Sequence, residues 1–328
     1  MKRHGSIWLV LLLALSLGAA VGCDTDDDGD GTGGSGGAGG TGGTGGTGGT
    51  GGTGGTGGAG GTGGEGGTGG TGGGEQVQRE VVLTGAQEVP PVATLATGSA
   101  TATLDGNTLT IEGEFSGLGS DLFPVGGTPA HVHFAPPGEN GPVVIPLEVT
   151  PGADNRSGTF TGTAELDATQ RQNFLDGDHY VNVHTENYPM GELRAQLADE
   201  APAAPDQLFE ITLSGDQEDP PVETAGTGVA SISRTGDVLT VNGSFRGLES
   251  VLTDVEGSSA HVYGADGILF DLEVVPGDDS RSGTFTGEHT MSADDVTAYE
   301  AGALYINVHT VDEPDGEIRG DIVPPAAP

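Results

Sequence analysis

Cysteine is almost absent from this chain, which has 328 residues and a single cysteine, Cys23. One thiol excludes an intramolecular disulfide, a CxxC redox pair and a cysteine-rich zinc cluster. Basic residues are also scarce, with 10 Lys and Arg against 48 Asp and Glu and a formal net charge of −38. Because nucleic-acid binding needs a basic surface that displaces counterions from phosphate, this balance argues against nucleic acid as a partner.

Sequence signatures of catalysis are equally sparse. No H-E-x-x-H metalloprotease motif and no phosphate-binding loop occurs in the chain. Carboxylates are so numerous that no pair stands out as acid and base. We therefore expect a binding or structural protein rather than an enzyme.

The N-terminus has the pattern of an export signal. Lys2 and Arg3 precede a mostly apolar run at positions 7–21, shorter than the roughly 20 residues that span a bilayer. The run ends in Ala-Ala-Val-Gly before Cys23, which resembles the lipobox of bacterial lipoproteins, although Ala20 stands where that family usually has Leu. The resemblance implies a signal peptide at 1–22 and lipidation of Cys23. The alternative is an ordinary signal peptide that leaves a free thiol.

A low-complexity segment follows at 23–75. It begins with an acidic stretch at 24–30, whose D-x-D-x-D-G opening matches a calcium loop but whose twelfth position is Ser35 instead of Glu. It continues as Gly-Gly-Thr repeats without proline, which excludes a collagen helix. We expect a solvated spacer and a disordered Gly-rich tether, whose repeats span roughly 35–40 Å r.m.s..

The rest of the chain contains two copies of one module, at 79–197 and 208–322. A linker at 198–207 joins them, and a tail follows at 323–328. The segment L-T-G-A-Q-E-V-P-P-V at 83–92 returns as L-S-G-D-Q-E-D-P-P-V at 213–222. The spacing between matching segments falls from 130 to 125 residues, so the second copy lacks about five residues near 136–140. A period this long indicates tandem domains.

Each module has the pattern of an all-β domain. Short β-branched or alternating runs, such as 100–104, 109–114 and 179–185, are separated by Gly, Pro and Asn turn signals. One short helix is expected at 168–175 and its counterpart at 294–301. The pattern predicts two tandem Greek-key domains, each a β-barrel or a sandwich.

Several of these segments carry a family resemblance. A-H-V-H at 130–133, S-G-T-F-T-G at 157–162, Y-V-N-V-H-T at 180–185 and G-E-L-R at 191–194 together resemble the CHRD domain, named for chordin. The resemblance implies a β-barrel or immunoglobulin-like fold distantly similar to copper/zinc superoxide dismutase. It implies little biochemistry, because the bacterial members have no clear assigned function.

Histidines are the candidate ligands. His131 and His133 share one strand face, and His184 shares a face with Tyr180 and Asn182, opposite the valines. If the two strands pair, three imidazoles converge on a site suited to copper or zinc.

The second module keeps two of these histidines, His261 and His309, but has Tyr263 in the middle place. We therefore expect any metal site there to be weaker. The alternative in both modules is that the histidines hydrogen-bond to loops. The Glu-x-Arg pairs at 192–194 and 317–319, on the terminal strand of each module, are expected to be surface or edge ion pairs, with a ligand-facing role as the alternative.

Together these features predict a lipid-anchored protein of the bacterial cell envelope, on the periplasmic or the outer side, that displays two β-domains to an unidentified ligand. The alternative is a copper- or zinc-binding protein, with superoxide-dismutase-like redox chemistry as its furthest extension. The acidity belongs to the domains, since residues 75–328 hold 42 Asp and Glu and eight Arg, a net of −34.

Overall fold

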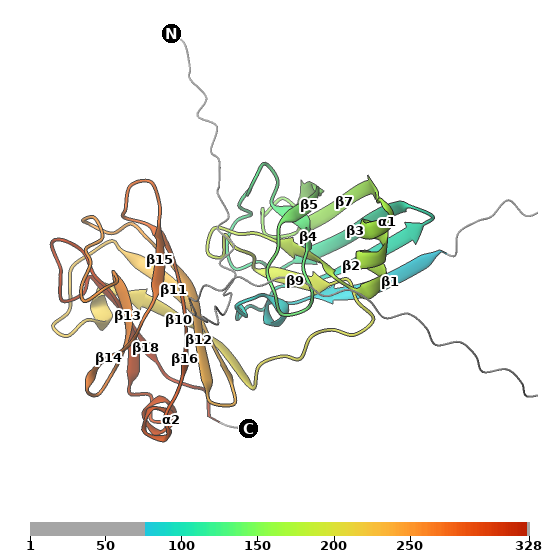
Figure 1. Cartoon of the computed structure of the whole chain (residues 1–328). Helices are drawn as coiled ribbons and strands as arrows, with labels where there is room; N and C mark the ends of the chain where they lie inside the picture. Colours follow the sequence, from blue (N-terminus) through green and yellow to red (C-terminus); the bar gives the residue numbers. More distant parts are fainter. Residues whose placement is uncertain (1–75, 327–328) are drawn as a thin grey trace, which may run out of the picture. The chain divides into compact units, whose positions relative to one another are not determined.

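The structure is a computed structural model that describes residues 76–326 (Figure 1). The expected signal peptide at 1–22, the lipidation site Cys23 and the tether at 23–75 lie outside the described residues. The described residues contain both repeated modules. Both are built almost entirely of strands, so the prediction of an all-β fold is confirmed.

Domain 1 contains a five-stranded antiparallel sheet in the order β1-β2-β3-β7-β6. Its strands are β1 (Val77–Leu83), β2 (Thr97–Asp105), β3 (Thr108–Ser116), β6 (Glu148–Pro151) and β7 (Gly158–Glu165). The β2–β3 connection is a tight turn with Gly106 at φ +62°, a conformation that glycine adopts without steric cost.

A second sheet of four strands has the order β5-β4-β8-β9. Its strands are β4 (Ala130–Phe134), β5 (Val143–Pro146), β8 (His179–Val183) and β9 (Leu193–Gln196). Thr84, just after β1, exchanges backbone hydrogen bonds with Arg194 of β9, at N···O distances of 3.0 and 3.2 Å. This bridge joins the two sheets along one side, so the strands form a nearly closed barrel.

The barrel interior is filled by alternate side chains of both sheets. Val132, Val181, Val183, Leu193 and Ala195 of the four-stranded sheet are all fully buried in this core. The five-stranded sheet contributes Ala102, Leu104, Leu109, Ile111 and Phe160, among others. Because strand side chains alternate between faces, these positions determine which residues of each strand point outward.

Domain 2 repeats this order of elements. Its strands are β10 (Gln207–Ser214), β11 (Thr227–Thr235), β12 (Val238–Arg246), β13 (Ala260–Gly264), β14 (Gly267–Asp271), β15 (Glu273–Pro276), β16 (Gly283–Thr290), β17 (Leu304–Val308) and β18 (Ile318–Ile322). They form one continuous sheet, because β10 and β18 pair as named strands where domain 1 has only the bridge. The correspondence confirms the tandem repeat.

Short helices lie at the same place in both domains. They are α1 (Ala168–Asp176) and α2 (Ala293–Glu300), with 3-10 turns η1 (Gly85–Gln87) and η2 (Gly215–Gln217) after the first strands. Asp167 and Ser292 cap the helices through capping boxes, so both predicted helices are confirmed.

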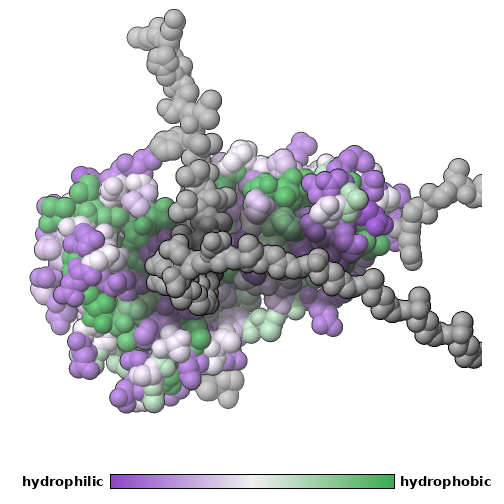
Figure 2. All heavy atoms as spheres, in the orientation of Figure 1, coloured by the Kyte–Doolittle hydropathy of each residue, from purple (hydrophilic) through white to green (hydrophobic). Residues whose placement is uncertain are grey.

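Among residues 76–326, no helix is long and apolar enough to cross a membrane. On the face drawn in Figure 2, hydrophobic residues form patches that hydrophilic residues interrupt.

Candidate metal centre

The candidate site lies on the outward face of the four-stranded sheet of domain 1. Strand β4 pairs with β8 so that His131 faces Asn182 and His133 faces Tyr180. Since the intervening valines point into the barrel, the histidines point away from it, as the alternation predicts. A register shift between Val132 and His133 in the β4–β5 pair marks a β-bulge next to the second histidine.

These outward side chains are nevertheless buried. His131, His133 and His184 are 2%, 9% and 3% exposed. Loops cover this face of the sheet, and backbone atoms of residues 141 and 189 contact the histidine rings. The face is thus a second, polar core that is separate from the apolar core of the barrel.

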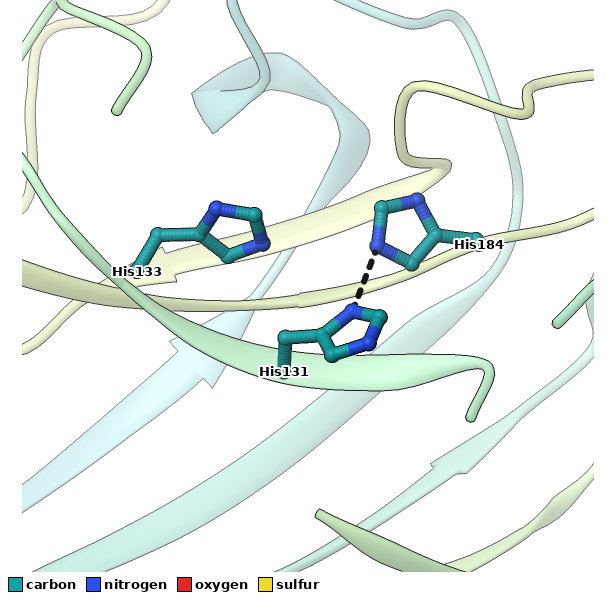
Figure 3. Close-up of side chains that lie close together, drawn as sticks. All are labelled: His131, His133 and His184. Carbon is teal, nitrogen blue, oxygen red and sulfur yellow. Dashed lines mark hydrogen bonds between the residues drawn. The ribbon is translucent and has the colours of Figure 1, made fainter. Parts of the chain in front are cut away.

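The three imidazoles converge on one point. Nδ1 of His131 lies 3.1 Å from Nε2 of His184, and one nitrogen of each of the three rings lies within 4.8 Å of the others. Figure 3 shows one nitrogen of each ring turned toward the space between them. The structure therefore brings together all three histidines that the sequence singled out in domain 1.

Backbone carbonyls fix which nitrogens face this space. Nδ1 of His133 is 2.9 Å from the Gly141 carbonyl oxygen, and Nδ1 of His184 is 2.9 Å from the Pro189 carbonyl oxygen. A carbonyl only accepts, so both Nδ1 atoms carry the proton when the rings are neutral and both Nε2 atoms hold a lone pair. Nε2 of His133 is buried without a hydrogen-bond partner.

His131 is the adaptable member of the set. Its Nδ1 can donate to the Nε2 lone pair of His184. The backbone of Val125 also forms a hydrogen bond that raises the pKa of His131, opposing the larger effect of burial. With the proton moved to Nε2, Nδ1 of His131 becomes a third lone pair directed at the same space.

Burial keeps the rings neutral. Desolvation, together with the neighbouring imidazoles, lowers the pKa of His131 to about 4 and that of His184 to about 3. Desolvation also lowers the pKa of His133. Neutral imidazole is the form that binds metal, so no proton must leave at neutral pH before an ion binds.

The donor set fits copper or zinc. Three imidazole nitrogens suit either ion, and the bond lengths of about 2.0–2.1 Å place two ligands no more than about 4.2 Å apart. Ligand atoms separated by as much as 4.8 Å would therefore have to approach one another by at least half an ångström, and by about 1.4 Å at the tetrahedral angle that zinc prefers. The orphaned Nε2 of His133 is the atom that would gain a partner.

Domain 2 arranges the corresponding residues differently. Nδ1 of His261 is 3.1 Å from Nε2 of His309, and Tyr263 Oη is 3.2 Å from the same Nε2. Nδ1 of His309 is 3.0 Å from the Pro314 carbonyl oxygen, as in domain 1. Burial raises the pKa of Tyr263, which disfavours the phenolate that a metal would need. Nε2 of His309 therefore already has two hydrogen-bond partners, whereas Nε2 of His261 is buried without one, and the weaker site expected here stays a prediction.

Nε2 of His261 differs from its counterpart in having a carboxylate nearby, Asp271 Oδ1 at 3.6 Å. Desolvation lowers the pKa of His261, and Asp271 opposes that shift. The domain 1 residue opposite His131 is Pro146. No sequence signal predicts this difference, because the carboxylate is ten residues from His261.

The prediction of a surface ion pair between Glu192 and Arg194 is wrong. Both residues are fully buried and they do not pair with each other. Glu192 accepts hydrogen bonds from Thr94 Oγ1, the Gly119 N–H and Thr185 Oγ1 at 2.7–2.8 Å. The sequence places the pair on one side of the strand, but it does not show the loops that cover that side.

The second pair differs in detail. Glu317 is likewise buried and accepts from Thr224 Oγ1, the Glu249 N–H and Thr310 Oγ1. Arg319 is partly exposed and pairs with Asp321 at 2.8 Å instead of with Glu317. The prediction of a surface pair is therefore wrong for the carboxylate here as well.

Another buried carboxyl of domain 1 belongs to Glu88. Glu88, after η1, is near Arg194 and Asn182, and one of its oxygens has no partner. Desolvation raises its pKa to about 8, against the opposing effect of Arg194. Its counterpart Glu218 has a pKa raised to about 7, again by burial.

The fold and this buried polar face define an all-β tandem-domain protein with a histidine cluster on the outside of its first barrel. The CHRD domain model matches the chain twice, at residues 79–197 and 209–322. The chain therefore belongs to the CHRD domain family, as its motifs indicated. No curated protein and no solved structure matches the chain.

Proposed function

We propose that the chain is a lipid-anchored protein of the bacterial cell envelope whose first CHRD domain binds a copper or zinc ion. His131, His133 and His184 are the ligands. The observation that supports the metal site best is the convergence of three neutral imidazoles, two of which are held by backbone carbonyls with their lone pairs facing one space. In metal sites, a hydrogen bond between the other ring nitrogen of a histidine ligand and a backbone carbonyl orients the ring.

The anchor rests on the sequence. The lipobox-like segment before Cys23 supports lipidation there, and the Gly-rich repeats at 23–75 would separate the domains from the lipid surface.

Metal content and affinity test the proposal. The chain expressed as Cys23→Ala, so that it is not lipidated, is titrated with Cu(II) and with Zn(II) by calorimetry, and its metal content is measured after dialysis. We expect one tightly bound ion per chain. The matched control is the same chain with His131, His133 and His184 all replaced by alanine, because it keeps every carboxylate that could bind cations weakly.

Equal binding by the two chains would overturn the metal site. Near-UV circular dichroism checks that the control chain is folded. The proposal is binding without turnover, so copper-loaded protein should remove superoxide no faster than the histidine-free control. Faster removal would indicate an enzyme instead.

A further inference from the structure

The loop between β4 and β5 of domain 1 is longer than its counterpart in domain 2. In domain 1 it runs through Pro136–Pro142, whereas in domain 2 β13 and β14 are joined by a tight turn at Ala265-Asp266. Domain 2 also has Tyr263 where domain 1 has His133. The longer loop and the third imidazole therefore occur together.

Gly141 connects this loop to the histidine. Its carbonyl oxygen lies 2.9 Å from Nδ1 of His133, and its N–H donates to Tyr180 Oη at 3.2 Å. A Cβ atom at this position would lie 1.8 Å from the Phe134 carbonyl oxygen. Only glycine allows the backbone to approach so closely, so the position of this carbonyl depends on the residue type.

Arg194 binds the two residues of the loop that directly precede Gly141. Its guanidinium donates to the Glu139 carbonyl oxygen at 3.0 Å and lies 3.3 Å from Asn140 Oδ1. The guanidinium carbon lies 3.6 Å from the centre of the Tyr180 ring. That ring stacks on the other side against His133, with centroids 4.8 Å apart and planes 8° from parallel. Arg194, Tyr180 and His133 thus form a three-layer stack beneath the loop.

Domain 2 has the same three-layer stack, but its arginine does not bind a loop. Arg319 lies 3.6 Å from the centre of the Tyr305 ring, and Tyr305 stacks on Tyr263. With no loop to reach, the Arg319 guanidinium hydrogen-bonds to Asp321 instead. In domain 1 the residue at that place is Gln196, which accepts from Arg194 at 2.8 Å.

We propose that Arg194 is a positioning residue for the metal site: through Glu139 and Asn140 it fixes the loop whose Gly141 carbonyl holds His133 as the Nδ1–H tautomer. This keeps the Nε2 lone pair of His133 aimed at the other two imidazoles. The inference rests on the proposed metal binding, and it explains why only domain 1 has a complete ligand set. Without the loop carbonyl, a histidine at this position can carry its proton on Nε2 instead of Nδ1. Its Nε2 then has no lone pair to offer to the site.

The test is Arg194→Lys, which keeps the positive charge beside Glu88 but loses the planar fork that reaches the loop. Two measurements are made on the full chain carrying Cys23→Ala. Long-range 1H–15N correlation spectra of metal-free protein report the His133 tautomer, and calorimetry reports the Zn(II) affinity. We expect the parent to show Nδ1–H alone, and the variant to show both tautomers and an affinity lowered by about 10–100-fold.

Arg319→Lys is the matched control, since it changes the equivalent stack of domain 2. It should alter neither readout. A folded Arg194→Lys chain with the parent's tautomer and affinity would overturn the inference. If that variant does not fold, Asn140→Ala, at the exposed end of the loop, replaces it with the same expected direction and the same overturning result. Should the parent bind no Zn(II), the proposed function fails, yet the tautomer measurement still decides whether Arg194 positions His133.

Discussion

Nδ1 of His131 and Nε2 of His184 lie 3.1 Å apart, and the same distance separates Nδ1 of His261 from Nε2 of His309. The two domains thus share a pair of imidazoles with one geometry. What distinguishes them is the third position, His133 in one and Tyr263 in the other. The shared pair makes each domain a control for the other.

Exchanging the residues His133 and Tyr263 between the domains should lower the Zn(II) affinity of domain 1 and raise that of domain 2. His133→Tyr leaves domain 1 with two imidazoles and a phenol, so we expect Zn(II) binding to weaken by about 100-fold or more. The reciprocal Tyr263→His gives domain 2 a third imidazole but no loop to orient it, so binding should appear there yet remain weaker than in domain 1. Calorimetry of both variants checks this. Unchanged affinity in His133→Tyr would remove this histidine from the ligand set.

Loss of the buried carboxylate Glu192 should destabilise domain 1. Glu192→Ala leaves the buried Thr185 hydroxyl and two less buried donors, Thr94 Oγ1 and the Gly119 N–H, without their acceptor, at a cost of about 2–4 kcal/mol in the free energy of unfolding. Glu112→Ala, on the exposed face of β3, is the matched control and should change it by about 0.5 kcal/mol or less. Urea denaturation measures both. Similar values for the two variants would show that the Glu192 hydrogen bonds add little.

The titration of Glu88 should make the domain less stable at high pH. Burial raises the pKa of Glu88 from 4.5 to about 8, so the folded state binds more protons than the unfolded state between these values. This contribution is complete below pH 4.5 and is lost as the pH rises through 8. Glu88→Gln removes the titration while keeping the shape.

At each pH, the free energy of unfolding of Glu88→Gln is subtracted from that of the parent. The contributions of Glu218 and of other titrating groups, which both chains share, then cancel. Relative to Glu88→Gln, the parent should lose stability in urea denaturation between pH 5 and pH 9, by an amount on the order of a few kcal/mol. Parallel pH profiles would contradict the raised pKa.

Removal of Cys23 should release the protein from the membrane. Cys23→Ala eliminates the only thiol, so after cell fractionation the chain is expected in the soluble fraction, while the parent stays with the membranes. Because the domains carry a net charge of −34, they should not adhere to anionic lipid without the anchor. Membrane retention of Cys23→Ala at the parent's level would exclude lipid anchoring through this residue.

Much of the candidate site was predictable from strand alternation. The pattern placed His131 and His133 on one face of a strand, placed His184 with Tyr180 and Asn182, and required only that the strands pair, which they do. The burial of that face was not predictable, because it depends on loops whose path is set by tertiary contacts. The same loops turned the expected surface residues Glu192 and Arg194 into buried ones.

The carbonyls that orient the His133 and His184 rings come from Gly141 and Pro189, and both act through the main chain. The geometry of the histidine cluster therefore depends in part on the path of the backbone, which the side-chain types of the cluster do not reveal. An alanine scan that spared glycine and proline would pass over both contacts. A related domain could conserve its three histidines and still lose the centre by shortening one turn.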